Sequence, residues 1–119
     1  MFYEQDWILR QISIIIKFIR SLLSKESNVY EQDEEQTVFK EEIEKLIELN
    51  RLKEANSLIV KTSKDKDVLA LGLWFYALLN DLSDKKLEEG ALAREDILKG
   101  LRTLLYNSDR IDNSIVDII

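Results

Sequence analysis

Apolar side chains recur along this chain at the three- and four-residue spacing that is typical of amphipathic helices. Residues 37–49 show the pattern most clearly, because the opposite face is charged and one face collects Phe39, Ile43, Leu46 and Ile47. Together with helix stop signals, this spacing predicts a series of helices. They run from about Glu4 to Ser24, from Thr37 to Leu49, from Leu52 to Thr62, from Val68 through the apolar run that follows it, and from Arg94 to Tyr106.

The predicted helices are separated by residues that commonly begin or end a helix. Asn50 follows the second helix, and asparagine tolerates the left-handed conformation in which many helices end. Asp65 or Asp67 is the expected N-cap of the fourth helix. A short helical turn is expected to begin at Ser83 and to end at Gly90.

The whole chain, residues 1–119, is expected to form one domain, because 119 residues suffice for one hydrophobic core and hardly for two. Residues 25–36 are polar and are predicted to form a loop, whereas residues 108–119 either dock as a last helical turn or fray. The chain has no proline and three glycines, which argues against a turn-rich β protein. We therefore predict an all-α, single-domain bundle of about five helices.

The fourth predicted helix contains the run VLALGLWFYALL, twelve residues without a charge. Because a membrane span needs about 20 apolar residues, this run is expected to be a buried central helix. The first and fourth helices should then be the main elements of the core. Gly72 would let a neighbouring backbone approach closely. Trp74, Phe75 and Tyr76 point in three directions on a helix, so we expect core packing there rather than a ligand pocket.

Composition removes several kinds of chemistry. The chain has no cysteine and no histidine, so disulfides, thiolate sites, most zinc sites and the commonest general base are excluded. Gly72, Gly90 and Gly100 are isolated from one another, and the chain has no glycine-rich phosphate loop. We therefore predict a protein that is not an enzyme and has no catalytic, metal-binding or cofactor-binding residues. No cofactor and no small-molecule substrate are indicated.

The charge distribution bears on partners and location. The formal net charge is −6, and residues 31–54 contribute −5, from four basic and nine acidic residues. That acidic segment is either a face for a basic partner or a solubilising surface. Outside the first helix the sequence has no basic stripe with interleaved aromatic residues. Nucleic-acid binding is therefore not expected. Glu4 and Asp6 precede the first apolar run, so we expect no secretory signal and a cytoplasmic location.

The first helix is more apolar than one side of a core requires. In DWILRQISIIIKFIRSLL, residues 6–23, the apolar arc spans roughly 220° of a helical wheel, against roughly 100° for a one-sided surface helix. A narrow edge carries Arg10, Lys17 and Arg20. The central line of the arc is formed by Ile8, Ile12, Ile15, Ile19 and Leu22, one flank by Trp7, Ile14 and Phe18, and the other flank by Leu9, Ile16 and Leu23.

Three interpretations of this wide arc are open. In the first, the other helices cover the first helix completely. In the second, one flank is a protein-binding surface, most simply between two copies of the chain. In the third, the helix lies on a membrane. We predict a cytoplasmic, non-catalytic interaction or scaffold module that binds another protein or forms a homodimer through these flanks. Peripheral membrane attachment is the alternative, and it is less favoured because the basic edge holds only three cations.

The segment IEKLIELNRLKEANSLI resembles the helical hairpin of tetratricopeptide repeats, in which a turn residue separates two helices and an alanine of the second packs against the first. The matching positions are Leu46, Asn50, Leu52, Ala55 and Ile59. The usual closing proline and a second copy of the repeat are missing. An ordinary helical hairpin is therefore an equal interpretation of the middle of the chain.

DWILRQI at residues 6–12 and LEEGALAREDILKGL at residues 87–101 resemble a family of small uncharacterised all-helical proteins of Gram-positive bacteria, which begins with a motif of the DYIMRQI type. Trp7 stands where tyrosine is usual in that motif, and Leu9 where methionine is usual. The resemblance implies an all-α fold and a cytoplasmic location. It implies no activity and no catalytic residue.

Overall fold

The computed structural model describes residues 2–23 and 34–118, and within them the side chains of residues 7–23 and 36–117. Every regular element in these ranges is a helix, which confirms the all-α prediction. The helices in these ranges are α1 (Phe2–Leu23), α2 (Glu34–Glu48), α3 (Leu52–Ser63), α4 (Leu69–Asn80), α5 (Asp84–Glu89), α6 (Arg94–Asn107) and α7 (Asn113–Ile118).

The predicted long helices correspond to α1, α2, α3, α4 and α6, and they differ from the prediction mainly at their ends. α2 begins at Glu34 instead of Thr37, so the helix includes residues 34–36 of the predicted loop. The remainder of the predicted loop and the end of the first predicted helix, residues 24–33, lie outside the described residues. The C-terminal stretch docks as α7, and the Tyr106 hydroxyl of α6 donates a hydrogen bond to the Asp117 carboxylate of α7.

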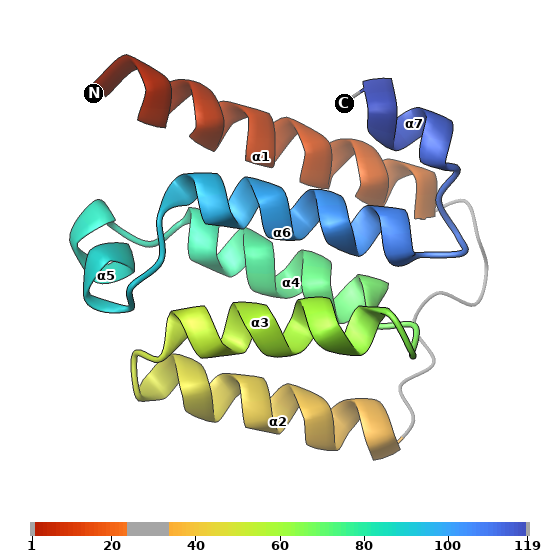
Figure 1. Cartoon of the computed structure of the whole chain (residues 1–119), viewed down its shortest axis with the longest axis horizontal. Coiled ribbons are helices and arrows are strands. Elements are labelled where there is room, and N and C mark those ends of the chain that lie inside the picture. The colour runs from red at the N-terminus through yellow and green to blue at the C-terminus, as the bar shows by residue number, and fades with distance from the viewer. Residues whose placement is uncertain (1, 24–33, 119) are drawn as a thin grey trace.

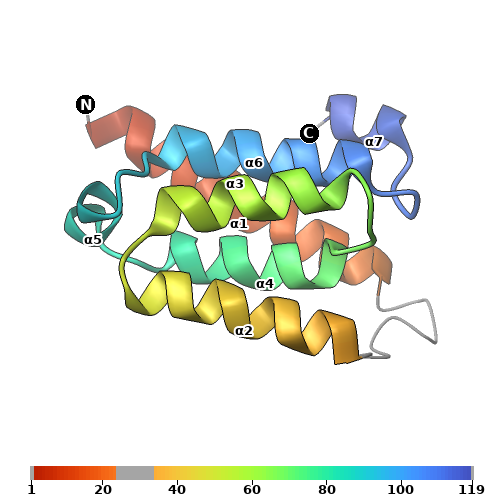
Figure 2. The same cartoon turned by 60° about the horizontal axis from the view of Figure 1, so that its bottom comes forward.

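α6 lies in the middle of the bundle (Figure 1). It packs against α1, α3, α4 and α7, whereas α2 packs on α3. α5 lies at one end of the bundle and α7 at the other (Figure 2). The sequence indicated the first and fourth helices as the main core elements, and it did not indicate how many neighbours α6 has. Gly100 makes that close packing possible, since a Cβ there would overlap the side chains of Tyr76 and Asn56.

The core confirms the interpretation of the aromatic run in α4. Phe75 and Tyr76 are fully buried. Burial raises the pKa of the Tyr76 hydroxyl, which donates a hydrogen bond to Oδ1 of Asn56 at 2.6 Å. The expected close approach of a neighbouring backbone to Gly72 is wrong in detail, because a Cβ there would overlap the side chain of Leu104 from α6.

Two non-glycine residues in the left-handed conformation end helices. Asn50 has φ 57° after α2, as its position in the sequence predicts. α5 ends where it was predicted to end, with Gly90 at its C-cap position and φ −86°, and the left-handed conformation falls on the next residue, Ala91, with φ 57°. Gly90 instead makes room for a neighbour, since a Cβ there would overlap the Leu52 side chain of α3.

The predicted capping is confirmed at the N-terminal end of α5 and wrong at that of α4. The N-cap position of α4 is Val68, which makes no side-chain capping hydrogen bond, and Asp67 lies one residue before it, where its Oδ1 accepts from the Leu69 N–H at 3.2 Å. The Ser83 hydroxyl oxygen accepts from the Lys86 N–H at 3.2 Å and caps α5.

Candidate interaction surface

One line of large apolar side chains on α1 is open to solvent. Trp7 is 57 % exposed, Ile14 58 % and Phe18 46 %. Their spacing of seven and four residues keeps them on one side of the helix over about three turns. These three residues are one of the two flanks that the sequence singled out, and we refer to them as the α1 stripe.

The other predicted flank of α1 is not a surface. Ile16 and Leu23 are each 4 % exposed and belong to the core, and Leu9 is half-buried. The side-chain amide of Asn80 in α4 donates to the Leu9 carbonyl oxygen at 3.2 Å. α1 packs on both α4 and α6, so the core covers this flank together with the central line. Leu9, Ile16 and Leu23 are therefore removed from the candidate surface.

Cations border the α1 stripe. Arg10, Lys17 and Arg20 are exposed on the same helix. Residues 7–23 contain no acidic residue. Residues 7–23 of α1 therefore contribute a charge of +3, although the chain as a whole carries a net charge of −6.

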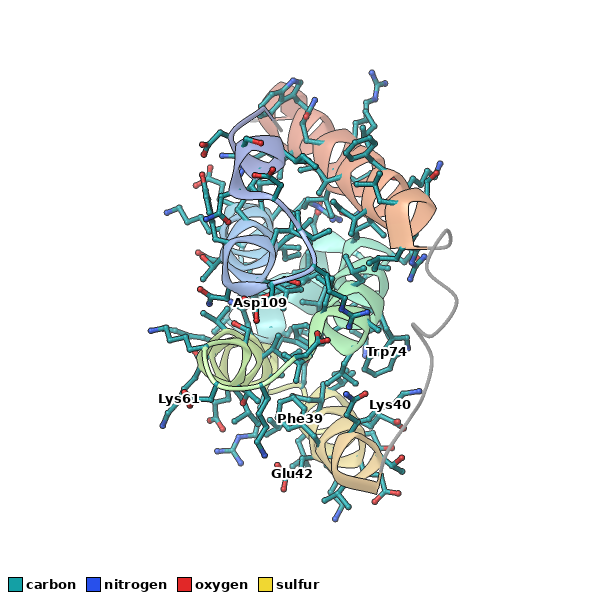
Figure 3. The ribbon with its side chains drawn as sticks, turned by 90° about the vertical axis from the view of Figure 1, so that its right-hand side faces the viewer. Phe39, Lys40, Glu42, Lys61, Trp74 and Asp109 are labelled. Carbon is teal, nitrogen blue, oxygen red and sulfur yellow. The ribbon has the colours of Figure 1, made fainter. Side chains whose placement is uncertain are left out.

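The opposite edge of the molecule carries the reverse charge. α2 lies there, on the far side of the bundle from α1 (Figures 1 and 3). Glu41 and Glu48 are exposed on it, and the apolar residues Val38 and Leu49 are 56 % and 65 % exposed. We refer to Val38, Glu41, Glu48 and Leu49 as the α2 edge. Val38 and Leu49 stand apart from the apolar face of their helix, so the apolar spacing of the sequence did not indicate them.

Trp74 of α4 is only partly buried, and it contacts α2. The Lys40 ammonium of α2 lies 4.9 Å from the centre of the Trp74 ring, a cation–π contact. Seen along the bundle, Phe39 points toward α3, whereas Lys40 lies near Trp74 (Figure 3). The exposed side of α2 is therefore turned away from the rest of the molecule.

Arg94, the first residue of α6, is buried. Its guanidinium donates to Oδ1 of Asp84 at 2.9 Å, to the Leu82 carbonyl at 3.0 Å and to the Asn80 carbonyl at 3.3 Å. These bonds hold the start of α6 against the connection between α4 and α5, which is a structural role. Among the residues that the structure describes, no group of carboxylates is arranged to hold a metal ion.

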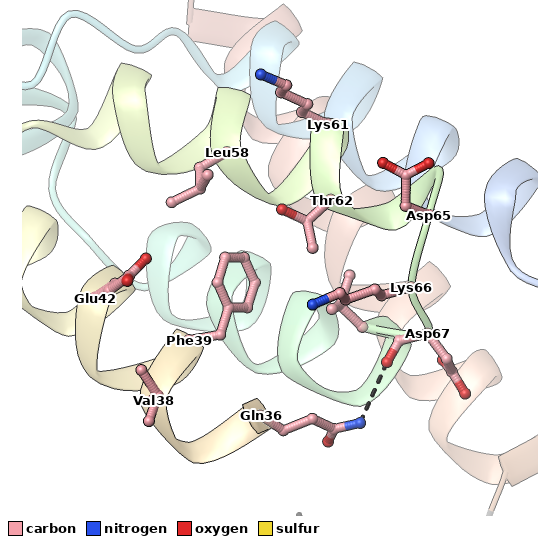
Figure 4. Close-up of a pocket in the computed structure, with 11 residues that line it drawn as sticks. Gln36, Val38, Phe39, Glu42, Leu58, Lys61, Thr62, Asp65, Lys66 and Asp67 are labelled. Atoms are coloured by element: carbon pink, nitrogen blue, oxygen red, sulfur yellow. Dashed lines mark hydrogen bonds between the residues drawn. The ribbon is translucent and has the colours of Figure 1, made fainter. Parts of the chain in front are cut away.

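A groove of about 980 Å³ lies between α2 and α3 (Figure 4). Phe39 and Leu58 contribute apolar walls, and the Gln36 side-chain amide donates to the Asp67 carbonyl at 3.3 Å beside it. Lysines and carboxylates share the rim, so the rim indicates no single ligand charge. The sequence could not reveal this groove, because two helices and a turn must be placed together to form it.

The fold and the surface define this protein as a small all-α helical bundle with an exposed apolar stripe on its first helix. The chain belongs to a family of unknown function, DUF6483, which matches residues 2–108. The membership agrees with the resemblance to an uncharacterised family, whereas the Gram-positive distribution and the tetratricopeptide likeness stay predictions. Comparisons with curated proteins and with solved structures find no match. Within the described ranges, no helix combines the length and apolarity needed to cross a membrane.

Proposed function

We propose that this protein is a cytoplasmic, non-catalytic interaction module that self-associates through the α1 stripe. The observation that carries the proposal is the exposure of Trp7, Ile14 and Phe18 in one line, while the other apolar side chains among residues 8–23 are largely covered. A large apolar side chain left in water forgoes about 1.5–3 kcal/mol relative to a buried one. A second protein surface over the stripe would recover part of that free energy.

The chemistry of the chain supports a non-catalytic role. It has no histidine or cysteine to act as a general base or a thiolate nucleophile. The buried guanidinium of Arg94 is bonded within the fold by Asp84, Leu82 and Asn80. The large exposed side chains among residues 7–23 of α1 are apolar or cationic, which suits binding.

The test is the mass of the protein in solution, measured by sedimentation over a range of concentrations. We expect the wild type to exceed the 14.0 kDa of one chain, and Phe18→Glu to return it to one chain, because a carboxylate cannot be buried in an apolar contact. Lys99→Glu, which adds negative charge on the exposed side of α6, is the matched control and should keep the wild-type mass. A wild type that stays at one chain at high concentration contradicts the proposal.

An anionic membrane surface is a second candidate partner for the same helix. The observation in its favour is that Trp7 and Phe18 lie beside three cations with no acidic residue between positions 7 and 23. It predicts co-sedimentation with phosphatidylserine vesicles that weakens as salt is added. Absence of vesicle binding at low salt would exclude this candidate.

A further inference from the structure

We infer that the surface that covers the α1 stripe is the α2 edge of a second copy, so that copies join head to tail. This inference rests on the proposed self-association and specifies which surface completes it. It follows from three features of the described residues: the direction of the two helices, the spacing of their exposed apolar residues, and the side on which their charges lie.

The direction of the helices suits such a contact. α1 and α2 lie at opposite edges of the bundle, and the chain runs through them in opposite directions (Figure 1). A second copy shifted past the α1 edge without rotation therefore presents its own α2 antiparallel to α1. The fold itself supplies the orientation, and no rearrangement of either copy is needed.

The apolar residues of the two edges have the same spacing. Trp7 and Phe18 are 11 residues apart, and Val38 and Leu49 are also 11 apart (18 − 7 and 49 − 38). At about 1.5 Å per residue, each pair spans roughly 16 Å. In an antiparallel arrangement Trp7 faces Leu49, and Phe18 faces Val38. Ile14, between them, meets the aliphatic part of side chains in the middle of α2.

The charges of the two edges are complementary in the same arrangement. On a helical wheel Arg10 and Lys17 lie roughly 60–90° to one side of the α1 stripe, and Glu41 and Glu48 lie at a similar angle to the same side of Val38 and Leu49. In an antiparallel helix pair, corresponding sides of the two helices meet. Arg10 then comes within two residues, about 3 Å along the axis, of Glu48, and Lys17 within the same distance of Glu41.

A two-fold contact between two α1 helices lacks this complementarity. If Trp7 faced Phe18 of a second α1, Arg10 would come beside Lys17 of that copy, and like charges would meet along the contact. A contact between two α2 edges would likewise set Glu41 against Glu48. The pairing of a cationic edge with an anionic one avoids both repulsions.

A contact between different surfaces leaves one free edge at each end of a pair. Because the copies are related by a shift without rotation, such an assembly grows as an open filament instead of stopping at a two-fold dimer. This difference provides a test that separates the head-to-tail contact from self-association in general.

The experiment uses two full-length variants, one blocked at each edge. Phe18→Glu blocks the α1 stripe, and Leu49→Arg blocks the α2 edge opposite Trp7 and Arg10; both residues are exposed, so both variants should fold. Circular dichroism verifies folding, and sedimentation gives the mass. We expect each variant alone at 14.0 kDa, and an equimolar mixture at twice that mass, 28.0 kDa, because one intact α1 stripe then meets one intact α2 edge.

Other outcomes overturn the inference in distinguishable ways. If Leu49→Arg keeps the wild-type mass while Phe18→Glu loses it, α1 binds something other than α2, and the proposed self-association stands without the head-to-tail contact. If both variants are single chains and their mixture also stays at one chain, the inference fails. If the wild type itself is a single chain, or binds vesicles of phosphatidylserine without self-associating, both the inference and the proposed function fail.

Discussion

At the residue scale, Asn50 and Ala91 have the same backbone φ of 57° and occupy corresponding positions after a helix. At the second of these ends, the Ala91 N–H donates to the Glu88 carbonyl and the Leu92 N–H to the Leu87 carbonyl, both at 3.0 Å. This pair of hydrogen bonds favours glycine at the left-handed position. Alanine there bears a steric cost of about 1 kcal/mol, because its Cβ crowds the following carbonyl.

We therefore expect Ala91→Gly to raise the free energy of unfolding by about 0.5–1 kcal/mol, measured by urea denaturation. The gain is smaller than the steric cost because glycine also adds conformational freedom to the unfolded chain. The matched control is Glu89→Gly, two residues earlier within α5, which should lower the free energy of unfolding by about 0.5–1 kcal/mol. Destabilisation by both variants would contradict the assignment of strain to Ala91.

At the scale of elements, α6 begins with a cation at the end of the helix that disfavours positive charge. The surroundings of Arg94 compensate for this placement. The Asp84 carboxylate accepts from its guanidinium, and Asp96 in the first turn accepts from the Ala93 N–H at 3.0 Å. Arg94 thus joins the start of α6 to the connection that follows α4.

We expect Arg94→Met to lower the free energy of unfolding by about 2–3 kcal/mol, since the Leu82 and Asn80 carbonyls lose a charged donor. Methionine keeps much of the side-chain volume, so the loss reports the hydrogen bonds. Lys99→Met on the exposed side of the same helix should change stability by no more than about 0.5 kcal/mol. Equal effects of the two variants would show that Arg94 does not hold α6 in place.

At the scale of the whole molecule, the chain separates its charges between two edges. The described side chains of α1 include three cations and no acid, and those of residues 36–49 include four acids and two cations. α3, α4 and α6 lie between these edges (Figure 1). A molecule polarised in this way attracts copies of itself in the head-to-tail orientation and repels them in the two symmetric ones.

A charge exchange between the edges tests this polarity. We expect Arg10→Glu with Lys17→Glu to raise the dissociation constant of self-association about tenfold or more, and Glu41→Lys with Glu48→Lys to do the same. The chain with all four substitutions should return toward the wild-type constant, measured by sedimentation equilibrium, because opposite charges face each other again. If the variant with all four substitutions keeps a raised dissociation constant, the pairing of these edges is contradicted.

The fold was predictable where its signals are local. The apolar faces of α2, α3 and α6, the left-handed Asn50 and the cap at Ser83 all follow from spacing and residue type within a few positions. The start of α2, the left-handed Ala91 and the groove beside Phe39 were not predicted. The first two depend on small differences in free energy between alternative ends of a helix. The groove depends on the distance between two helices.

The candidate surface was predictable only in part. The width of the apolar arc on α1 indicated two flanks, and either could have been the one left in water. The structure selects Trp7, Ile14 and Phe18, because α1 packs on both α4 and α6, and the central line and Ile16 are buried there. The exposed apolar residues of α2 were missed, because two apolar side chains far apart in the sequence do not form a recognisable helical pattern.

The sequence by itself determined that this chain folds into helices, approximately where each begins and ends, and that α1 carries more apolar surface than one contact covers. Each of these properties arises from residues close together in the chain. Only the tertiary structure decided which flank of α1 is covered, that α6 joins most of the bundle, and that the cationic and anionic edges lie on opposite sides. Those properties depend on which helices become neighbours, and that is set by the packing of the whole core.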